Sequence, residues 1–157
     1  LEVDLVKVAV VERHQGTGNV ACGFLKGYGI KEGAVALSIA HDSHNIIVVG
    51  VSDEEMEFAV NSLIEQEGGM VLVKEGKVIE SMPMPIAGLM SDQSGEWVDQ
   101  KLTDIHEKAY EELGICGDVE PVMTLCFMSL AVIPEIKLTD MGLFDVTTFS
   151  FIPVEAE

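Results

Sequence analysis

Residues 38–50 read Ser38-Ile-Ala-His41-Asp42-Ser43-His44-Asn45-Ile-Ile-Val-Val-Gly50, and this stretch decides how we interpret the fold. It places a polar segment, His41 to Asn45, between two apolar runs, Ala34 to Ala40 and Ile46 to Val51, that contain β-branched residues. We therefore expect two strands joined by the polar segment, as a hairpin or as a tight crossover. A polar loop fixed between buried strands is a place where a rigid scaffold can hold side chains for chemistry.

The flanking sequence predicts further strands and a helix. Leu5 to Val11 and Val20 to Leu25 are apolar runs separated by a Gly-rich turn, so we expect a strand for each. Ser52 can cap a helix whose apolar face repeats every three to four residues, and Gly68-Gly69 should end it. Two more strands, Met70 to Val73 and Lys77 to Met82, bracket a predicted hairpin turn at Glu75-Gly76.

The second half of the chain continues the α/β pattern. A second amphipathic helix is predicted from near Ser94 to Leu113, and Phe144 to Ile152 is typical of a closing strand. Val122 to Ile133 fits either a strand or a helix. The sequence thus predicts one α/β domain over residues 1–157, with a mixed sheet of about five to seven strands and two main amphipathic helices.

Composition and charge restrict the partners. The net charge of −18 repels phosphate backbones and anionic lipid, so we expect neither nucleic acid nor a membrane as partner. No segment reaches the ~20 apolar residues that span a bilayer. Cys22, Cys116 and Cys126 are odd in number and lack metal-ligand spacing, which favours a reducing cytoplasm over a disulfide framework.

Two polar loops supply the candidate site. Arg13 and His14 follow the first predicted strand, as the His41 to Asn45 loop follows the strand from Ala34. If those two strands lie side by side and parallel, both loops meet at one edge of the sheet, where α/β sheets bind ligands. The alternative for Arg13 is a surface ion pair with Glu12 or Glu32.

The spacing of His41 and His44 can place two imidazoles on one metal ion, with Asp42, His14 or water as a third ligand. The competing interpretation is that His41, Asp42, Ser43 and Asn45 hydrogen-bond the backbone of their own turn. The glycines at 16, 18, 27 and 29 do not complete GxGxxG, so we expect tight turns rather than a nucleotide loop. His106 is expected to be an exposed helix residue.

Several further segments extend a likeness that begins at residues 38–50. They are Glu12-Arg13-His14, Gly16-Thr17-Gly18-Asn19, Gly27-Tyr28-Gly29, Pro83-Met84-Pro85-Ile86-Ala87-Gly88-Leu89-Met90-Ser91-Asp92 and Pro134-Glu135-Ile136-Lys137-Leu138-Thr139-Asp140. In this order they resemble the C-terminal domain of adenine deaminases, a branch of the amidohydrolase superfamily. The likeness covers nearly the whole chain, but Gln15 stands where many members carry a second histidine.

The resemblance implies a parent enzyme that hydrolyses adenine to hypoxanthine and ammonia. In that family an upstream (β/α)₈ barrel binds a divalent metal, which we expect to be manganese, iron or zinc, and the metal activates water. The barrel requires about 250 residues and is absent from this chain. We therefore expect a fragment of a longer polypeptide that is inactive alone. Its partners would be that barrel and, in the full enzyme, adenine.

The resemblance assigns no catalytic residue to this chain. We expect Arg13, His14, His41, Asp42, His44 and Asn45 to face the barrel mouth or the domain interface. Two alternatives stay open: a noncatalytic assembly or regulatory module, which could form a homo-oligomer, and an independent small metal hydrolase using His14, His41 and His44.

Overall fold

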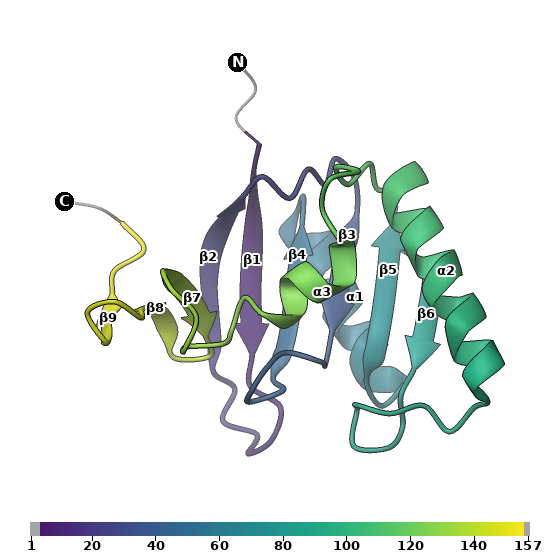
Figure 1. Cartoon of the computed structure of the whole chain (residues 1–157), viewed down its shortest axis with the longest axis horizontal. Helices are drawn as coiled ribbons and strands as arrows, with labels where there is room; N and C mark the ends of the chain where they lie inside the picture. The colour runs from purple at the N-terminus through teal and green to yellow at the C-terminus, as the bar shows by residue number, and fades with distance from the viewer. Residues whose placement is uncertain (1–3, 156–157) are drawn as a thin grey trace.

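The computed structural model describes residues 4–155. Its main feature is a six-stranded sheet with the strand order β2-β1-β4-β3-β5-β6 (Figure 1). The strands are β1 (Leu5–Val11), β2 (Val20–Lys26), β3 (Ala34–Leu37), β4 (Ile46–Gly50), β5 (Gly69–Lys74) and β6 (Lys77–Pro83). Each neighbouring pair in this sheet is antiparallel. The expected α/β class and strand count are confirmed.

The stretch at residues 38–50 forms the connection between β3 and β4 at the centre of the sheet. The two strands pair from Ala34 opposite Gly50 to Leu37 opposite Ile47, and all their residues are buried. Of the two expected connections the hairpin is therefore correct. Burial on both faces explains why these strands contain apolar residues at successive positions instead of alternating with polar ones.

The expectation that the strands from Leu5 and Ala34 lie side by side is wrong, because β4 lies between β1 and β3. Both strands pair antiparallel with β4, so they run in the same direction. Their carboxyl ends consequently still reach one edge of the sheet, although a strand separates them.

Both main helices begin where they were predicted, and a serine caps each of them. The Ser52 hydroxyl accepts the Glu55 N–H at 3.2 Å before α1 (Asp53–Glu65), and the Ser94 hydroxyl accepts the Trp97 N–H at 3.3 Å before α2 (Gly95–Glu111). Gly68, at φ +101°, lies where the chain turns from α1 into β5. No helix in the described part of the chain is long and apolar enough to cross a membrane.

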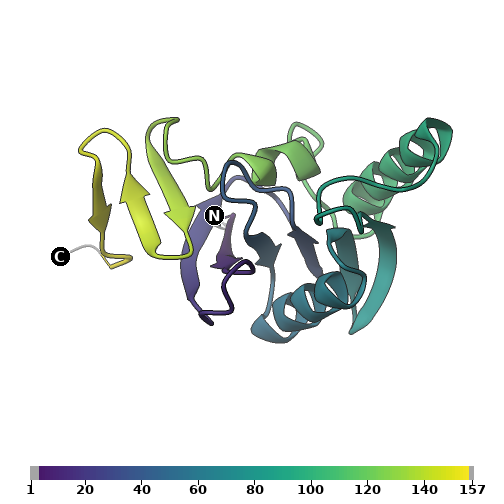
Figure 2. The same ribbon diagram turned by 90° about the horizontal axis from the view of Figure 1, so that it is seen from below.

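The helices cover opposite faces of the sheet (Figure 2). On one face α1 packs Met56, Ala59 and Leu63 against alternate residues of the central strands. On the other face Ile105 and Ala109 of α2 contribute to a larger cluster with Leu125. The main sheet is thus the middle layer of three, and both of its faces are packed.

The ambiguous segment after residue 120 forms a short helix, α3 (Pro121–Cys126), followed by turns. A small antiparallel sheet comes next: β7 (Ile136–Thr139), β8 (Gly142–Asp145) and β9 (Ser150–Ile152). The expectation of a single strand over Phe144 to Ile152 is therefore wrong. The Asp145 carboxylate accepts the Thr147 N–H at 2.8 Å and the Thr147 hydroxyl at 2.7 Å, which stabilises a turn and divides the segment into two strands.

Candidate functional site

Polar loops meet at the sheet edge where β1 and β3 end. Residues 12–19 follow β1, residues 38–45 follow β3, and residues 84–91 approach from the end of β6. Direct hydrogen bonds link the three loops through Arg13 and Ser38. The structure thus brings Arg13, His14 and the His41 to Asn45 segment together.

Arg13 joins these loops through backbone carbonyls. Its Nε donates to the His44 carbonyl at 2.5 Å, and its Nη2 donates to the Ala87 carbonyl at 2.9 Å. Its own N–H donates to Asn45 Oδ1 at 3.3 Å. Partial burial lowers the pKa of the guanidinium, but a group this basic keeps its charge.

The alternative of a surface ion pair for Arg13 is wrong. The Glu32 carboxylate pairs with Lys74 at 2.5 Å, and the Glu12 carboxylate accepts backbone N–H bonds from the loop that follows it. Arg13 therefore holds the backbone of the candidate site in place instead of neutralising a carboxylate.

Glu12 fills the concave side of the Gly-rich loop. Its carboxylate accepts N–H bonds from His14 at 2.5 Å, Gln15 at 2.7 Å and Thr17 at 3.0 Å. These bonds, with that of the Thr17 hydroxyl, lower the pKa of Glu12 to about 2. Because the loop amides already bind this internal carboxylate, they are not free to bind a phosphate, in agreement with the expectation of a turn.

The three histidines of the edge lie around the 41–45 turn. His14 Nε2 is 2.6 Å from the Ser43 carbonyl, which fixes the hydrogen on this nitrogen because a carbonyl can only accept. The His41 and His44 rings meet edge to face with centroids 5.1 Å apart. The His41 ring also stacks on the ring of Phe127, with the two centroids 5.0 Å apart.

His44 combines a left-handed backbone conformation with an unpaired ring nitrogen. It sits at φ +53°, its backbone N–H donates to the Ala40 carbonyl at 2.6 Å, and its Nδ1 is buried without a hydrogen-bond partner. Burial, with the neighbouring His41 and Arg13, lowers the pKa of His44 and favours the neutral ring. A neutral imidazole can accept or donate hydrogen bonds, but the buried Nδ1 is out of reach of a group that approaches this edge from outside.

In the described part of the chain no third protein ligand joins His41 and His44, the two predicted metal ligands. Within residues 4–155 no three His, Cys, Asp or Glu side chains are grouped so as to hold a metal ion. The pair on its own does not make the closed or open three-ligand set that zinc or iron sites require. Metal binding by His41 and His44 stays a prediction.

Ser38 is a site residue to which the sequence assigned no role. Its hydroxyl is fully buried, donates to the Gly88 carbonyl at 2.5 Å and accepts the Gly69 N–H at 2.7 Å. A Cβ at Gly68 would lie 2.5 Å from the Gly88 Cα, so these backbones touch. The signal in the sequence was a serine at the end of a wholly apolar strand together with the tandem glycines at 68 and 69.

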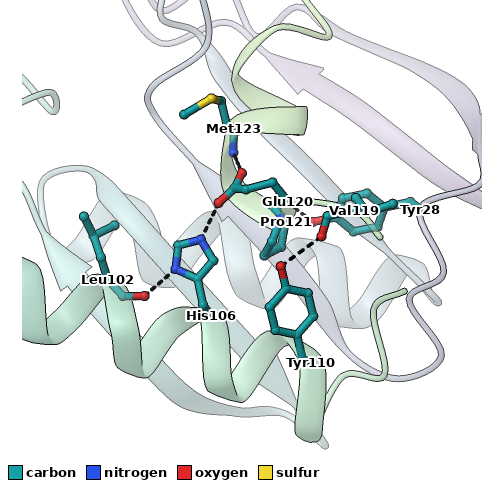
Figure 3. A network of polar contacts seen from close by, with 8 residues as sticks. All are labelled: Tyr28, Leu102, His106, Tyr110, Val119, Glu120, Pro121 and Met123. Carbon is teal, nitrogen blue, oxygen red and sulfur yellow. Dashed lines mark hydrogen bonds and ion pairs between the residues drawn. The ribbon is translucent and has the colours of Figure 1, made fainter. Parts of the chain in front are cut away.

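His106 also differs from expectation, since it is part-buried and not exposed (Figure 3). Its Nδ1 lies 2.5 Å from the Leu102 carbonyl, and its Nε2 contacts the Glu120 carboxylate. Glu120 in turn accepts the Met123 N–H and so caps α3. His106 therefore ties α2 to α3 and stands outside the candidate site.

The three layers and the polar edge define a small α/β domain. The family model described as the adenine deaminase C-terminal domain matches residues 1–150, and the chain belongs to this family. It is 74% identical over 153 residues to "Adenine deaminase 2" of Desulfotalea psychrophila, and 50% identical over 154 residues to "Adenine deaminase" of Bacillus subtilis. The family expected from the sequence is thereby confirmed.

These relatives are much longer than the chain. The alignments cover 98% of this chain but only 27% of the Desulfotalea protein and 26% of the Bacillus protein. The chain therefore spans about a quarter of the length of these two relatives.

Proposed function

We propose that this chain is the C-terminal domain of an enzyme that hydrolyses adenine to hypoxanthine and ammonia. In this reaction the oxygen of water bonds to C6 of the purine and the bond from C6 to the exocyclic amino nitrogen breaks. One proton of the water leaves with the amino group as ammonia, and the other stays on the hypoxanthine ring. Family membership and the names of the long relatives support this proposal. The divalent metal, manganese, iron or zinc, would belong to an amidohydrolase barrel in the same polypeptide, where it would activate the water.

The contribution of this domain would be to close the barrel mouth with its polar edge. The observation that carries this step is the gathering of His14, His41 and His44 on loops that Arg13 joins by hydrogen bonds. Imidazoles can donate and accept hydrogen bonds, so a cluster of them can meet polar groups of a neighbouring part of the polypeptide.

Closure by this edge would serve the reaction in two ways. Excluding water from the purine pocket strengthens each electrostatic contact inside it. A neutral His44 can also hydrogen-bond a group of the substrate or pass on a proton. Asp42 and Asn45 would complete the boundary, Asn45 by holding the Arg13 backbone.

The free thiols of Cys22, Cys116 and Cys126 support a cytoplasmic location, which we include in the proposal.

The test uses the full-length polypeptide and the variant His44→Ala. We expect kcat/KM for adenine to fall by about 100-fold or more, because positioned acid–base groups typically contribute about 10²- to 10⁴-fold. His106→Ala is the matched control, because it removes an imidazole outside the site; it should keep turnover near that of the wild type once equal folding is verified by thermal unfolding. Unchanged adenine turnover in His44→Ala would refute the role proposed for the edge.

A further inference from the structure

The C-terminal sheet exposes aromatic side chains on the face that points away from the main sheet. Cross-strand pairing puts Lys137, Phe144 and Phe151 in one row across β7, β8 and β9, and puts Leu138, Leu143 and Ile152 in the adjacent row. Successive residues of a strand point to opposite faces, so the two rows lie on opposite faces. Leu138 and Leu143 are the residues nearest to Gly23 of β2, which identifies the inner face.

The outer face contains three phenylalanines, of which Phe149 and Phe151 are exposed, while Lys137 in the same row is buried at 9% exposure. Phe144 makes edge-to-face contacts with Phe149 and Phe151, both at 5.2 Å between ring centroids. Phe149 is 77% exposed and Phe151 is 51% exposed. We call Phe144, Phe149 and Phe151 the aromatic face. Figure 2 shows these strands, in yellow and yellow-green, extending beyond β2 at one end of the molecule.

The aromatic face is continuous with the candidate site. A cavity of about 350 Å³ is lined by Phe144 and Phe151 and also by Asp42 and Ser43 of the histidine loop. Exposed apolar residues of the intervening segment, such as Val132 at 69%, extend the same surface. Clustered exposed apolar residues of this kind mark an interaction site in a soluble protein.

Two observations identify the occupant. The long relatives contain nearly three quarters of their length outside the region that matches this chain, so in them a large body of protein is attached to this domain. A second copy of the chain is a poorer occupant, because each copy carries a net charge of −18 and the two would repel each other.

We propose that the aromatic face is the surface by which this domain docks on the remaining part of the same polypeptide. Docking there would place Asp42 and Ser43, which border the same cavity, at the boundary between the two parts. The proposal rests on the proposed function, since it assigns the contact that would bring the histidine loop to the barrel. Large aromatic side chains at the centre of an interface contribute most of its binding free energy.

The test compares Phe149→Asp with Phe24→Asp in the full-length polypeptide. Phe149 has φ +53°, a conformation that aspartate tolerates better than most residues, so the substitution does not strain the turn. Phe24 is a matched control on β2, because it is 60% exposed and lies outside the aromatic face. Hydrogen–deuterium exchange, adenine turnover and solution mass are measured for both variants.

We expect Phe149→Asp to increase amide exchange in β7 to β9 by about tenfold or more, independently of protein concentration, and to lower adenine turnover. Phe24→Asp should leave both near the wild-type values. If exchange also rises in β3 and β4, the milder Phe149→Ser replaces the first variant, so that unfolding is not mistaken for undocking. Unchanged exchange in β7 to β9 would overturn the proposal, as would an effect confined to Phe24→Asp.

Two further outcomes are decisive. Dissociation of a dimer by Phe149→Asp, with adenine turnover unchanged, would assign the aromatic face to a second copy and overturn the proposal. Comparison with His44→Ala separates the docking proposal from the proposed role of the histidine loops. If His44→Ala loses adenine turnover while Phe149→Asp behaves like the wild type, the role of the loops is supported and the docking surface is refuted. Increased exchange in Phe149→Asp with full activity of His44→Ala keeps the docking surface and refutes the role of the edge.

Discussion

Removing one buried hydroxyl should loosen the support of the candidate site. Ser38 is fully buried, and its hydroxyl bridges the Gly69 N–H and the Gly88 carbonyl at 2.7 and 2.5 Å. In Ser38→Ala both backbone groups lose this partner. Water cannot replace the hydroxyl, because the Gly68 and Gly88 backbones touch beside it.

The expected cost follows from these two groups. Each buried polar group left unpaired costs about 1–3 kcal/mol, and removal of the hydroxyl itself recovers part of this. We therefore expect Ser38→Ala to lower the free energy of unfolding of the 157-residue chain by about 2–4 kcal/mol. Urea denaturation followed by circular dichroism measures this value directly.

Ser129→Ala provides a matched control for the same chemical change. Ser129 is also buried, at 6% exposure, but its hydroxyl has no hydrogen-bond partner. Removal of this hydroxyl should be neutral or should stabilise the chain by up to about 1 kcal/mol. The reason is that a buried polar group is removed and no other group loses a hydrogen bond. Equal losses of stability in Ser38→Ala and Ser129→Ala would refute the reasoning.

The pKa of Glu12 and the hydroxyl of Tyr28 give two further predictions. The folded-state pKa of Glu12 is about 2 against an ordinary 4.5, so the stability that Glu12 contributes is complete above pH 4.5 and is lost as the pH falls from 4.5 to 2. In Glu12→Gln the urea midpoint of unfolding should therefore decrease less steeply over this pH range than in the wild type. An equally steep decrease in both proteins would contradict the prediction. Tyr28→Phe leaves the Pro121 carbonyl without the 2.7 Å bond at a residue 1% exposed, and should cost about 1–2 kcal/mol in urea unfolding. Tyr110→Phe, at a more exposed 3.0 Å bond, is its control and should cost less.

Local signals in the sequence were sufficient for most elements of the fold. The serine cap at 52, the start of a helix near Ser94 and the hairpin turn at 75–76 were predicted because a few neighbouring residues determine them. The order of the strands depends on contacts between distant residues, so the insertion of β4 between β1 and β3 could not be read from the apolar pattern. The turn at Asp145 was missed because the apolar residues on its two sides resemble one continuous strand.

The candidate site shows a similar division. Which residues gather at the edge could be predicted, because β1 and β3 end in polar loops and run in the same direction. The partners of Arg13 could not, since it binds carbonyls of His44 and Ala87, and each residue of a chain carries such a carbonyl. The hydrogen bonds from the Gly-rich loop to the Glu12 carboxylate could not be predicted either, because they depend on the path of the backbone.

The way the edge uses its hydrogen bonds supports a role that is completed elsewhere. Arg13, Glu12 and Ser38 use their polar atoms on backbone groups, which fixes the loops. Within residues 4–155 no third ligand joins the histidines to hold a metal. An independent hydrolase would need that ligand or a nucleophile beside an activating base. A rigid but chemically incomplete edge is instead what a domain needs if it supplies one wall of a site whose reactive centre lies in another part of the polypeptide.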